Sequence, residues 1–348
     1  MERKEHERKK NKTGIIAVSF ILLMAAAFLL RPSKAEEEIV PEYVFSYAEN
    51  QAQDYPTTLG AMKFAEMVEE RTQGRIRILV YAEGSKGAEA EVIRQMKFGG
   101  VDFARVSLSQ LAEYIPEMNV LQMPYLYTDS EHMWRVLDGE IGVSFLSLAD
   151  EYDLVGLSWY DAGARNFYTA NRPVTCLEDI EGMRIRVQES EMMADMVEAL
   201  GANAVKIAYA DVYSGIERGL VDGAENNWPS YESMKHDEVA RYYTVDEHTR
   251  VPEMQICSGK TWEKLSGEDR DIILECARES ALYERALWKE REDASKQTAI
   301  LHGVTVIELS AEEKKRFQTA VQSVYEKYCG DQMEIIARII DEGQDAPK

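Results

Sequence analysis

The sequence predicts an α/β protein of two similar lobes, each built on a mainly parallel sheet flanked by helices. This prediction depends on a pattern that occurs twice. Residues 75–80 (Arg-Ile-Arg-Ile-Leu-Val) and 184–187 (Arg-Ile-Arg-Val) alternate as strands with one buried face do. Each run is followed by helical spacing and then by Gly-x-Val-Asp-x-Ala, at residues 99–104 and 219–224. Two such units in the same order indicate two lobes, and one large domain with an accidental repeat is the alternative.

The elements between these motifs follow from apolar spacing. A first helix is expected over about residues 88–98. Two later helices are marked by apolar residues four positions apart, namely Met192, Met196 and Leu200, then Val212, Ile216 and Leu220. Ligands of such sheets bind beyond the carboxyl ends of the strands. The matched strand ends, residues 105–107 and 225–227, should therefore face each other across a cleft that closes on a small molecule.

Composition excludes some functions. The 348 residues include 40 Lys plus Arg and 62 Asp plus Glu, for a net charge of -22. Residues 1–35 contain eight of these basic residues and three of the acidic ones, so the remainder has 32 against 59, or -27. A body this acidic repels nucleic acids and anionic lipid surfaces. With 45% hydrophobic and 29% charged residues, the chain has the composition of a folded globular protein.

The first 35 residues predict export. Residues 1–13 are basic, residues 14–30 are uncharged and mostly apolar, and Ser33 and Ala35 suit positions -3 and -1 of a cleavage site. The apolar run of 17 residues is at the short limit for crossing a bilayer, so an uncleaved anchor is the alternative. No second apolar run of that length occurs. We therefore expect a periplasmic or otherwise extracytoplasmic protein that touches the membrane only through this segment, if at all.

Signatures of catalysis and metal binding are absent from the sequence. It has no G-x-S-x-G, no phosphate-binding loop and no G-x-G-x-x-G. The five histidines are scattered, and no cysteine pair has metal-ligand spacing. We expect neither catalytic residues nor a metal or cofactor. For the four cysteines, disulfides and buried free thiols both remain open: Cys176, Cys257, Cys276 and Cys329.

Several polar side chains near the predicted strand ends suit a small ligand. Arg165 and Arg186 each offer parallel N–H donors that match a carboxylate, although pairing with surface acids is the plainer interpretation. Asn226 and Asn227 supply amide groups that suit hydroxyls. Aromatic rings near the same strand ends could hold the C–H face of a sugar, or could be plain core: Trp159, Tyr160, Tyr209, Tyr213 and Trp228.

These residues lie within motifs that resemble a known family. The motifs are Gly163-Ala164-Arg165, Leu177-Glu178-Asp179-Ile180-Glu181-Gly182-Met183-Arg184-Ile185-Arg186-Val187 and Val221-Asp222-Gly223-Ala224-Glu225-Asn226. Together they are similar to the core of the DctP-type substrate-binding proteins of tripartite ATP-independent periplasmic (TRAP) transporters. The similarity runs from about Tyr43 to the C-terminus. It implies a solute receptor that works with a membrane permease pair driven by an ion gradient.

The resemblance also implies an architecture. Two lobes would be joined by crossing strands and by a long helix within residues 266–301. We expect residues 41–161 plus 251–290 in lobe I, and residues 162–250 plus 291–345 in lobe II. Residues 1–35 would precede them as the signal peptide or anchor.

The resemblance assigns site residues as well. The carboxylate-binding arginine of the family falls on Arg186, its second arginine on Arg165, and the asparagine of its D-G-x-E-N motif on Asn226.

A finer pattern is similar to the branch that binds hexuronates such as galacturonate and glucuronate. It comprises residues 225–230, residues 186–190 with Gln188, and residues 246–249. Tyr55 stands where many relatives have histidine, so the contacts to the distal part of the sugar are in doubt. Glu91 and Arg105 are expected to contact the ligand. A C4-dicarboxylate or sialic acid is the alternative ligand, and an anchored carbohydrate-active enzyme is the alternative class.

Overall fold

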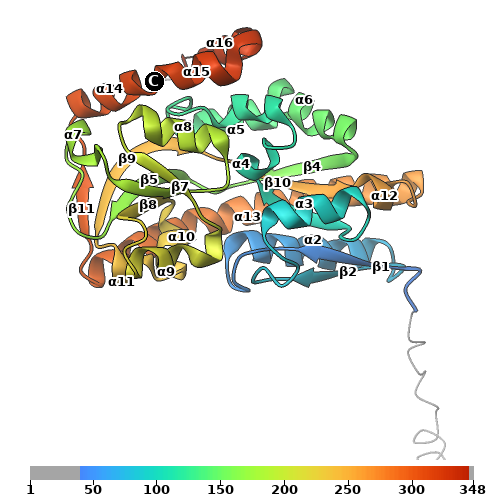
Figure 1. The fold of residues 1–348 in the computed structure, drawn as a ribbon. Coiled ribbons are helices and arrows are strands. Elements are labelled where there is room, and N and C mark those ends of the chain that lie inside the picture. The colour runs from blue at the N-terminus through green and yellow to red at the C-terminus, as the bar shows by residue number, and fades with distance from the viewer. Residues whose placement is uncertain (1–39, 345–348) are drawn as a thin grey trace, which may run out of the picture. The chain divides into compact units, whose positions relative to one another are not determined.

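Two separate sheets organise residues 40–344, the part of the chain that the computed structural model describes (Figure 1). The first sheet has the strand order β2-β1-β3-β10-β4 and the second has β11-β9-β5-β8-β6-β7. The strands of the first sheet are β1 (Tyr43–Ala48), β2 (Ile76–Tyr81), β3 (Phe103–Ser107), β4 (Leu154–Tyr160) and β10 (Glu253–Ser258). Those of the second are β5 (Ala164–Thr169), β6 (Arg184–Val187), β7 (Asn203–Lys206), β8 (Gly223–Asn226), β9 (Tyr242–Arg250) and β11 (Thr305–Glu308).

Each sheet is parallel except for one strand. In the first sheet β10 runs antiparallel to both of its neighbours, β3 and β4. In the second sheet β5 runs antiparallel to both β8 and β9. These are the strands that enter from the other sheet, because β5 follows β4 and β10 follows β9 along the chain. The chain therefore crosses between the sheets twice through strands, in agreement with the expected crossing strands.

Helices pack around both sheets (Figure 1). The α-helices before residue 200 are α2 (Pro56–Arg71), α3 (Glu89–Lys97), α4 (Leu108–Leu111), α5 (Ser130–Asp138), α6 (Glu140–Leu148), α7 (Leu177–Ile180) and α8 (Glu191–Ala199). Those after it are α9 (Val212–Glu217), α10 (Trp228–Ser233), α11 (His236–Val239), α12 (Gly259–Trp262), α13 (Gly267–Leu301), α14 (Ala311–Ala320), α15 (Gln322–Cys329) and α16 (Met333–Gln344). Short 3-10 helices are η1 (Pro116–Gln122), η2 (Ala149–Tyr152), η3 (Tyr209–Asp211) and η4 (Gly330–Gln332).

The elements expected from the repeat are present. The alternating runs form β2 and β6, the helical spacing forms α3, α8 and α9, and the two Gly-x-Val-Asp-x-Ala motifs lead into β3 and β8. A parallel strand follows each helix because the intervening helix returns the chain to the same end of the sheet. The repeat thus places the carboxyl ends of β3, β6 and β8 where a ligand site is expected.

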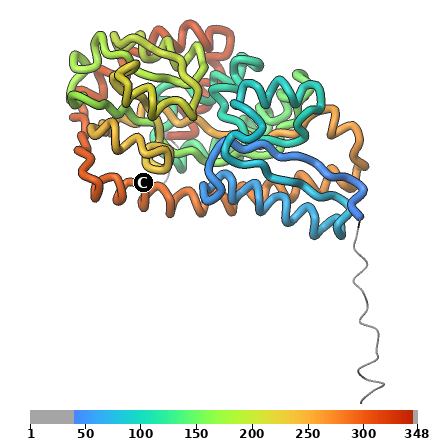
Figure 2. The backbone as a smooth tube through the Cα atoms, turned by 60° about the horizontal axis from the view of Figure 1, so that its bottom comes forward, coloured from blue at the N-terminus to red at the C-terminus, as the bar shows by residue number. Residues whose placement is uncertain are grey.

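Helix α13 is the third connection between the two sheets. It has 35 residues, which corresponds to a length of about 50 Å. Ser266 caps its first turn by accepting a hydrogen bond from the Asp269 backbone N–H at 3.1 Å. The helix packs against α2 and β4 and, further along, against α10. Figure 2 shows it running along both halves of the body, as the expected long helix does.

The three last helices contact elements of both halves. Helix α15 packs on α8 and on η1, and α16 packs on α5. The Nε2 atom of His132 on α5 lies 2.6 Å from the carbonyl oxygen of Ile339 on α16. A large apolar core cluster likewise combines residues of both sheets, for example Val106 and Val187 with Phe317. The lobe boundaries expected from the sequence stay a prediction.

Three further expectations concern the ends, the membrane and the cysteines. The proposed signal segment, residues 1–35, lies outside the described residues. Within residues 40–344, no helix is both long enough and apolar enough to cross a membrane. The four cysteines, all in this range, are free, and Cys257, Cys276 and Cys329 are buried. Of the two alternatives for the cysteines, the structure has free thiols.

The contact between α2 and α13 leads to a test of packing. A Cβ atom at Gly60 would lie 2.9 Å from both Glu284 Cβ and Tyr160 Cε2. We expect Gly60→Ala to lower the free energy of unfolding by about 1–3 kcal/mol, because neither neighbour can move without disturbing α13 or β4. Urea denaturation of the purified protein measures this change.

Gly267 is the matched control, because a Cβ atom there has no neighbour within 4 Å. Gly267→Ala should leave the stability unchanged or raise it by up to about 1 kcal/mol. Equal stabilities for the two variants would contradict the proposed close packing.

Candidate ligand-binding site

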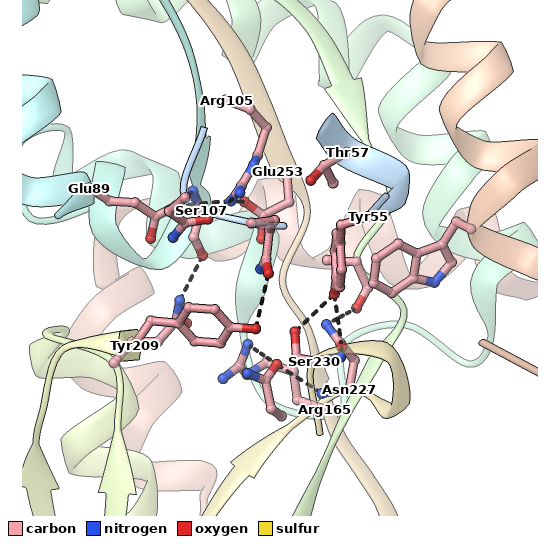
Figure 3. A pocket seen from close by; sticks show the side chains of 16 residues that line it. Tyr55, Thr57, Glu89, Arg105, Ser107, Arg165, Tyr209, Asn227, Ser230 and Glu253 are labelled. Atoms are coloured by element: carbon pink, nitrogen blue, oxygen red, sulfur yellow. Dashed lines mark hydrogen bonds and ion pairs between the residues drawn. The ribbon is translucent and has the colours of Figure 1, made fainter. Parts of the chain in front are cut away.

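A polar cavity lies between the carboxyl ends of strands from the two sheets. Its inner chamber has a volume of about 380 Å³ and its outer chamber one of about 690 Å³, and both volumes include space that is open to solvent. The chambers share the four lining residues Asn50, Glu89, Gln188 and Tyr209. Figure 3 shows the inner chamber, with Glu89, Arg105 and Glu253 on the side of the first sheet and Arg165, Asn227 and Ser230 on the side of the second.

Arg186 is a buried cation without a carboxylate partner among the described residues. Its strand β6 lies beside β8, with Arg186 opposite Ala224. Only 2% of the residue is exposed, and it lines the outer chamber. Its Nε donates to the Ile207 carbonyl oxygen at 2.8 Å, whereas Nη1 is buried without a hydrogen-bond partner in the described part of the chain. Burial lowers the pKa of Arg186, although an arginine stays charged. This guanidinium therefore lacks an anion.

Arg165, by contrast, is already paired. Its Nε and Nη2 donate to the two carboxylate oxygens of Glu225 at 2.5 and 2.9 Å, and Nη2 also donates to the Glu225 carbonyl oxygen. Its Nη1 donates to Asn226 Oδ1 at 3.0 Å. Four of the five N–H donors of an arginine are thus used. Burial opposes the charge on Glu225, but Arg165 and His248 outweigh it and lower its pKa to about 2.

A bulge in β9 brings His248 to this ion pair. Arg165 pairs with Thr249 and Phe167 with Thr244, so the four residues 245–248 of β9 lie opposite the single residue Asn166 of β5. His248 stacks on the Phe167 ring, and its Nδ1 lies 3.1 Å from both Asp246 carboxylate oxygens. Its Nε2 lies 3.4 Å from Glu225 Oε2. Burial alone would lower the pKa of His248, but the two carboxylates raise it to about 9.

On the side of the first sheet, Arg105 is surrounded by carboxylates. Its Nε and Nη2 bond the two oxygens of Glu49, and Nη2 also bonds Asn50 Oδ1. Its Nη1 donates to Glu89 at 3.0 Å and to Glu253 at 2.8 Å. Burial and the neighbouring Glu253 raise the pKa of Glu89 to about 8. All five N–H donors of Arg105 therefore have protein partners.

Hydrogen bonds cross the cavity from the first-sheet half to the second-sheet half. The Tyr55 hydroxyl lies 2.9 Å from Ser230 Oγ (Figure 3). The Tyr209 hydroxyl donates to Gln51 Oε1 at 3.0 Å. Gln188 Nε2 donates to Ser107 Oγ at 3.1 Å. Each bond joins residues far apart in the sequence, so the walls of the cavity are held together by side chains that also line it.

Most site residues predicted from the sequence line the cavity, and three do not. The lining includes the following predicted residues: Arg105, Arg165, Arg186, Gln188, Tyr209, Asn226 and Asn227. Glu91 is exposed and pairs with Arg94. The Tyr213 hydroxyl donates to Glu238, away from the chambers. Trp228 stacks on Tyr243 inside the second-sheet core, with ring centroids 3.6 Å apart. These three side chains have protein partners instead of facing the empty space.

Sequence reasoning missed several lining residues. Glu89 and Glu253 were not predicted, nor were Gln51 and Ser230. One signal was available for Glu253: an acidic residue begins an otherwise uncharged run, residues 253–258, which forms a fully buried strand. A buried carboxylate in such a strand requires a cation, which here is Arg105. Tyr55 was noted only as a departure from the family pattern, and it lines the cavity.

The structure shows no arrangement suited to metal binding. Among residues 40–344, no group of three or more His, Cys, Asp or Glu side chains could hold a metal ion. Four buried or nearly buried carboxylates at the cavity are instead paired with arginines, those of Glu49, Glu89 and Glu253 with Arg105 and that of Glu225 with Arg165. The site can accept hydrogen bonds from hydroxyls and donate them to a carboxylate, and both abilities suit the binding of a ligand.

Comparison with known proteins identifies relatives with the same fold. A family model described as bacterial extracellular solute-binding protein, family 7 (DctP), matches residues 47–331. A solute-binding protein of Chromohalobacter salexigens is 37% identical over 287 residues, which are 82% of this chain and 85% of that protein. A C4-dicarboxylate-binding protein of Bacillus subtilis is 28% identical, with 84% of each chain covered.

Solved structures are similar as well. A TRAP periplasmic solute-binding protein of a Bradyrhizobium species, in complex with galacturonate, is 38% identical with a TM-score of 0.83, covering 87% of this chain and 100% of that one. A TRAP protein of Pseudomonas putida F1 with bound D-glucuronate is 36% identical with a TM-score of 0.83, covering 85% and 96%. The two sheets and their crossings are therefore shared with solved receptors.

The position of His248 leads to a pH-dependent prediction. Its folded-state pKa of about 9 lies above the ordinary value near 6.5. Its charged form therefore stabilises the fold fully below about pH 6.5, and this contribution is lost as the pH rises through about 9. The loss corresponds to about 3 kcal/mol at 1.36 kcal/mol per pKa unit.

The measurement is urea unfolding of the wild type and of His248→Gln at several pH values. The wild-type stability should fall more steeply than that of the variant between about pH 6.5 and 9. Glu89 titrates in the same range but is present in both proteins, so their difference reports His248. Parallel stability curves would show that folding does not raise the pKa of His248.

Proposed function

Because the chain belongs to family 7 of the bacterial extracellular solute-binding proteins, we propose that it captures a hexuronate such as galacturonate or glucuronate. The chain is a TRAP-type solute receptor and not an enzyme. Its family and its structural neighbours are likewise solute-binding proteins. Solved relatives with 38% and 36% identity carry galacturonate and D-glucuronate. These ligands combine one carboxylate with several hydroxyls, which is the combination that the cavity suits.

The observation that carries this proposal is the unpaired guanidinium of Arg186. One of its five N–H groups donates to the Ile207 carbonyl oxygen. The other four donate no hydrogen bond to any acceptor within residues 40–344. A buried charge without a partner is costly, and a ligand carboxylate would remove that cost with parallel charge-assisted hydrogen bonds. Arg165 has one N–H left on Nη1 to support the same carboxylate.

The hydroxyls of the sugar would meet the remaining polar lining. Gln188 has a buried Oε1 atom without a partner in the described part of the chain, which can accept a hydroxyl proton. Tyr209, Asn227 and Ser230 supply further oxygen and nitrogen atoms around the inner chamber. The cavity walls would close on the ligand through the contacts that cross it, such as Tyr55 to Ser230.

We further propose how the receptor is used in the cell. Residues 1–35 would direct export as a cleaved signal or remain as an anchor. The receptor would then deliver its ligand to a TRAP permease in the membrane. Residues 41–161 with 251–290 and residues 162–250 with 291–345 would move as lobes around their connections. The distribution of the strands supports this division, since the first sheet uses residues 43–160 and 253–258 and the second residues 164–250 and 305–308.

Substitution of Arg186 tests the proposal. Removing one partner of a buried arginine–carboxylate pair costs about 2–5 kcal/mol. At 1.4 kcal/mol per decade, Arg186→Ala should weaken hexuronate binding by about 30-fold to a few thousand-fold in calorimetry. Arg186→Lys should not recover the affinity, because a point charge cannot replace the planar fork.

Arg184 is the matched control. It lies two residues earlier on the same strand, with 45% of its side chain exposed and paired with Asp222. Arg184→Ala should bind the acid as the wild type does. Galactose and glucose, which lack the carboxylate, should bind the wild type far more weakly than their acids. Equal affinities for acid and neutral sugar would refute the carboxylate clamp and the hexuronate assignment.

A further inference from the structure

We propose that Glu89 and Glu253 make this receptor selective for ligands with a single carboxylate, by repelling a second carboxylate on the first-sheet side of the cavity. This inference rests on the proposed function and deepens it, since it concerns which acids the same site accepts. Some relatives bind C4-dicarboxylates, as the Bacillus subtilis protein does by its name. The observations that separate this chain from a dicarboxylate receptor are its own charges and hydrogen bonds.

The first observation is that Arg105 has no donor to offer. Glu49 and Asn50 take its Nε and Nη2 hydrogens, and Glu89 and Glu253 take the two on Nη1. Arginine has five N–H donors, so none remains for a ligand. Although Arg105 lines the inner chamber, it cannot receive a carboxylate unless a protein carboxylate leaves.

The second observation is an excess of negative charge around Arg105. Three carboxylates, those of Glu49, Glu89 and Glu253, contact one guanidinium. Their formal sum is -2 when all three are ionised. Only 2% of the Arg105 side chain and none of the Glu49 side chain is exposed, so solvent screens this group poorly. The excess lies at the cavity, because Glu89 and Glu253 both line the inner chamber.

The third observation is that the surroundings of Glu89, which belongs to this cluster of carboxylates, already disfavour its ionised form. Glu89 accepts hydrogen bonds through Oε1 from Ser107 N and Arg105 Nη1, both at 3.0 Å. Arg165 and Arg186 face it from β5 and β6, and Glu253 faces it from β10. Despite these cations, burial and Glu253 raise the pKa of Glu89 to about 8. A ligand carboxylate placed here would add a further negative charge to a site that already favours a proton.

The second-sheet side of the cavity offers a buried cation, whereas Glu189, which also lines the outer chamber, is exposed to solvent. There, Arg165 is neutralised by Glu225, and Arg186 remains without a carboxylate among residues 40–344. A ligand carboxylate is therefore drawn to the second sheet, and the remainder of the ligand faces Glu89 and Glu253. Hydroxyls suit that position, because they donate hydrogen bonds to carboxylates. A second carboxylate has no proton to donate, and it is repelled most strongly above about pH 8, where Glu89 is ionised.

The test compares D-galacturonate with galactarate, the dicarboxylate of the same carbon number, by calorimetry on the full-length protein at about pH 8.5, where most Glu89 is ionised. Galactarate also differs in being an open chain, so the informative quantity is how the ratio of the two dissociation constants changes. In the wild type galactarate should bind at least about tenfold more weakly. In Glu89→Gln and in Glu253→Gln this ratio should fall by about threefold to tenfold, because each substitution removes one of the negative charges that repel the second carboxylate.

Glu91→Gln is the matched control, since Glu91 lies on the same helix as Glu89 but is exposed and paired with Arg94. The ratio of the galactarate and galacturonate dissociation constants should be the same in Glu91→Gln as in the wild type. Equal binding of both acids by the wild type, or a ratio unchanged in both cavity variants while they still bind galacturonate, would overturn the inference and leave the proposed function standing. Failure of the wild type to bind either acid would refute the proposed function, and this inference with it.

Discussion

The buried ion pair between Arg165 and Glu225 determines the electrostatics of the whole cavity. Both side chains are almost fully buried, and they join the neighbouring strands β5 and β8. Losing either partner would leave an uncompensated charge in the protein interior, which costs about 3–5 kcal/mol. Because Glu225 consumes most of the donors of Arg165, Arg186 is left as the cation that is free to bind an anion. The two arginines differ in role although their strands, β5 and β6, both lie beside β8.

The local part of the fold could be predicted from the sequence, and the long-range part could not. Alternation over a few residues predicts a strand such as β6, and spacing by four predicts a helix such as α8, because both patterns report burial within one element. The insertion of β10 between β3 and β4 depends on pairing between residues about 150 positions apart, for example Glu253 with Ser107. No local pattern contains that information, and the crossing strands and α13 were expected only from the resemblance to a family.

The same distinction holds at the site. Arg186 near the end of β6 was a candidate from the alternating strand, but the sequence pattern alone favoured pairing with a surface acid, and only the resemblance to a family indicated a ligand carboxylate. Glu91 was chosen instead of Glu89, and the two residues differ by about 200° around helix α3 at 3.6 residues per turn. Glu89 therefore faces the cavity while Glu91 faces solvent. Trp228 was expected at the ligand, but its ring fills the second-sheet core against Tyr243. Such choices depend on helix orientation, which composition and spacing do not specify.

Strands β10 and β11 come late in the sequence, and this has a consequence for the order in which the two sheets can be completed. The first sheet lacks a central strand until residues 253–258 have been synthesised, and the second lacks its edge strand until residues 305–308. Neither half can complete its hydrogen bonding while the C-terminal part of the chain is still missing. Completion of both sheets therefore requires nearly the entire polypeptide.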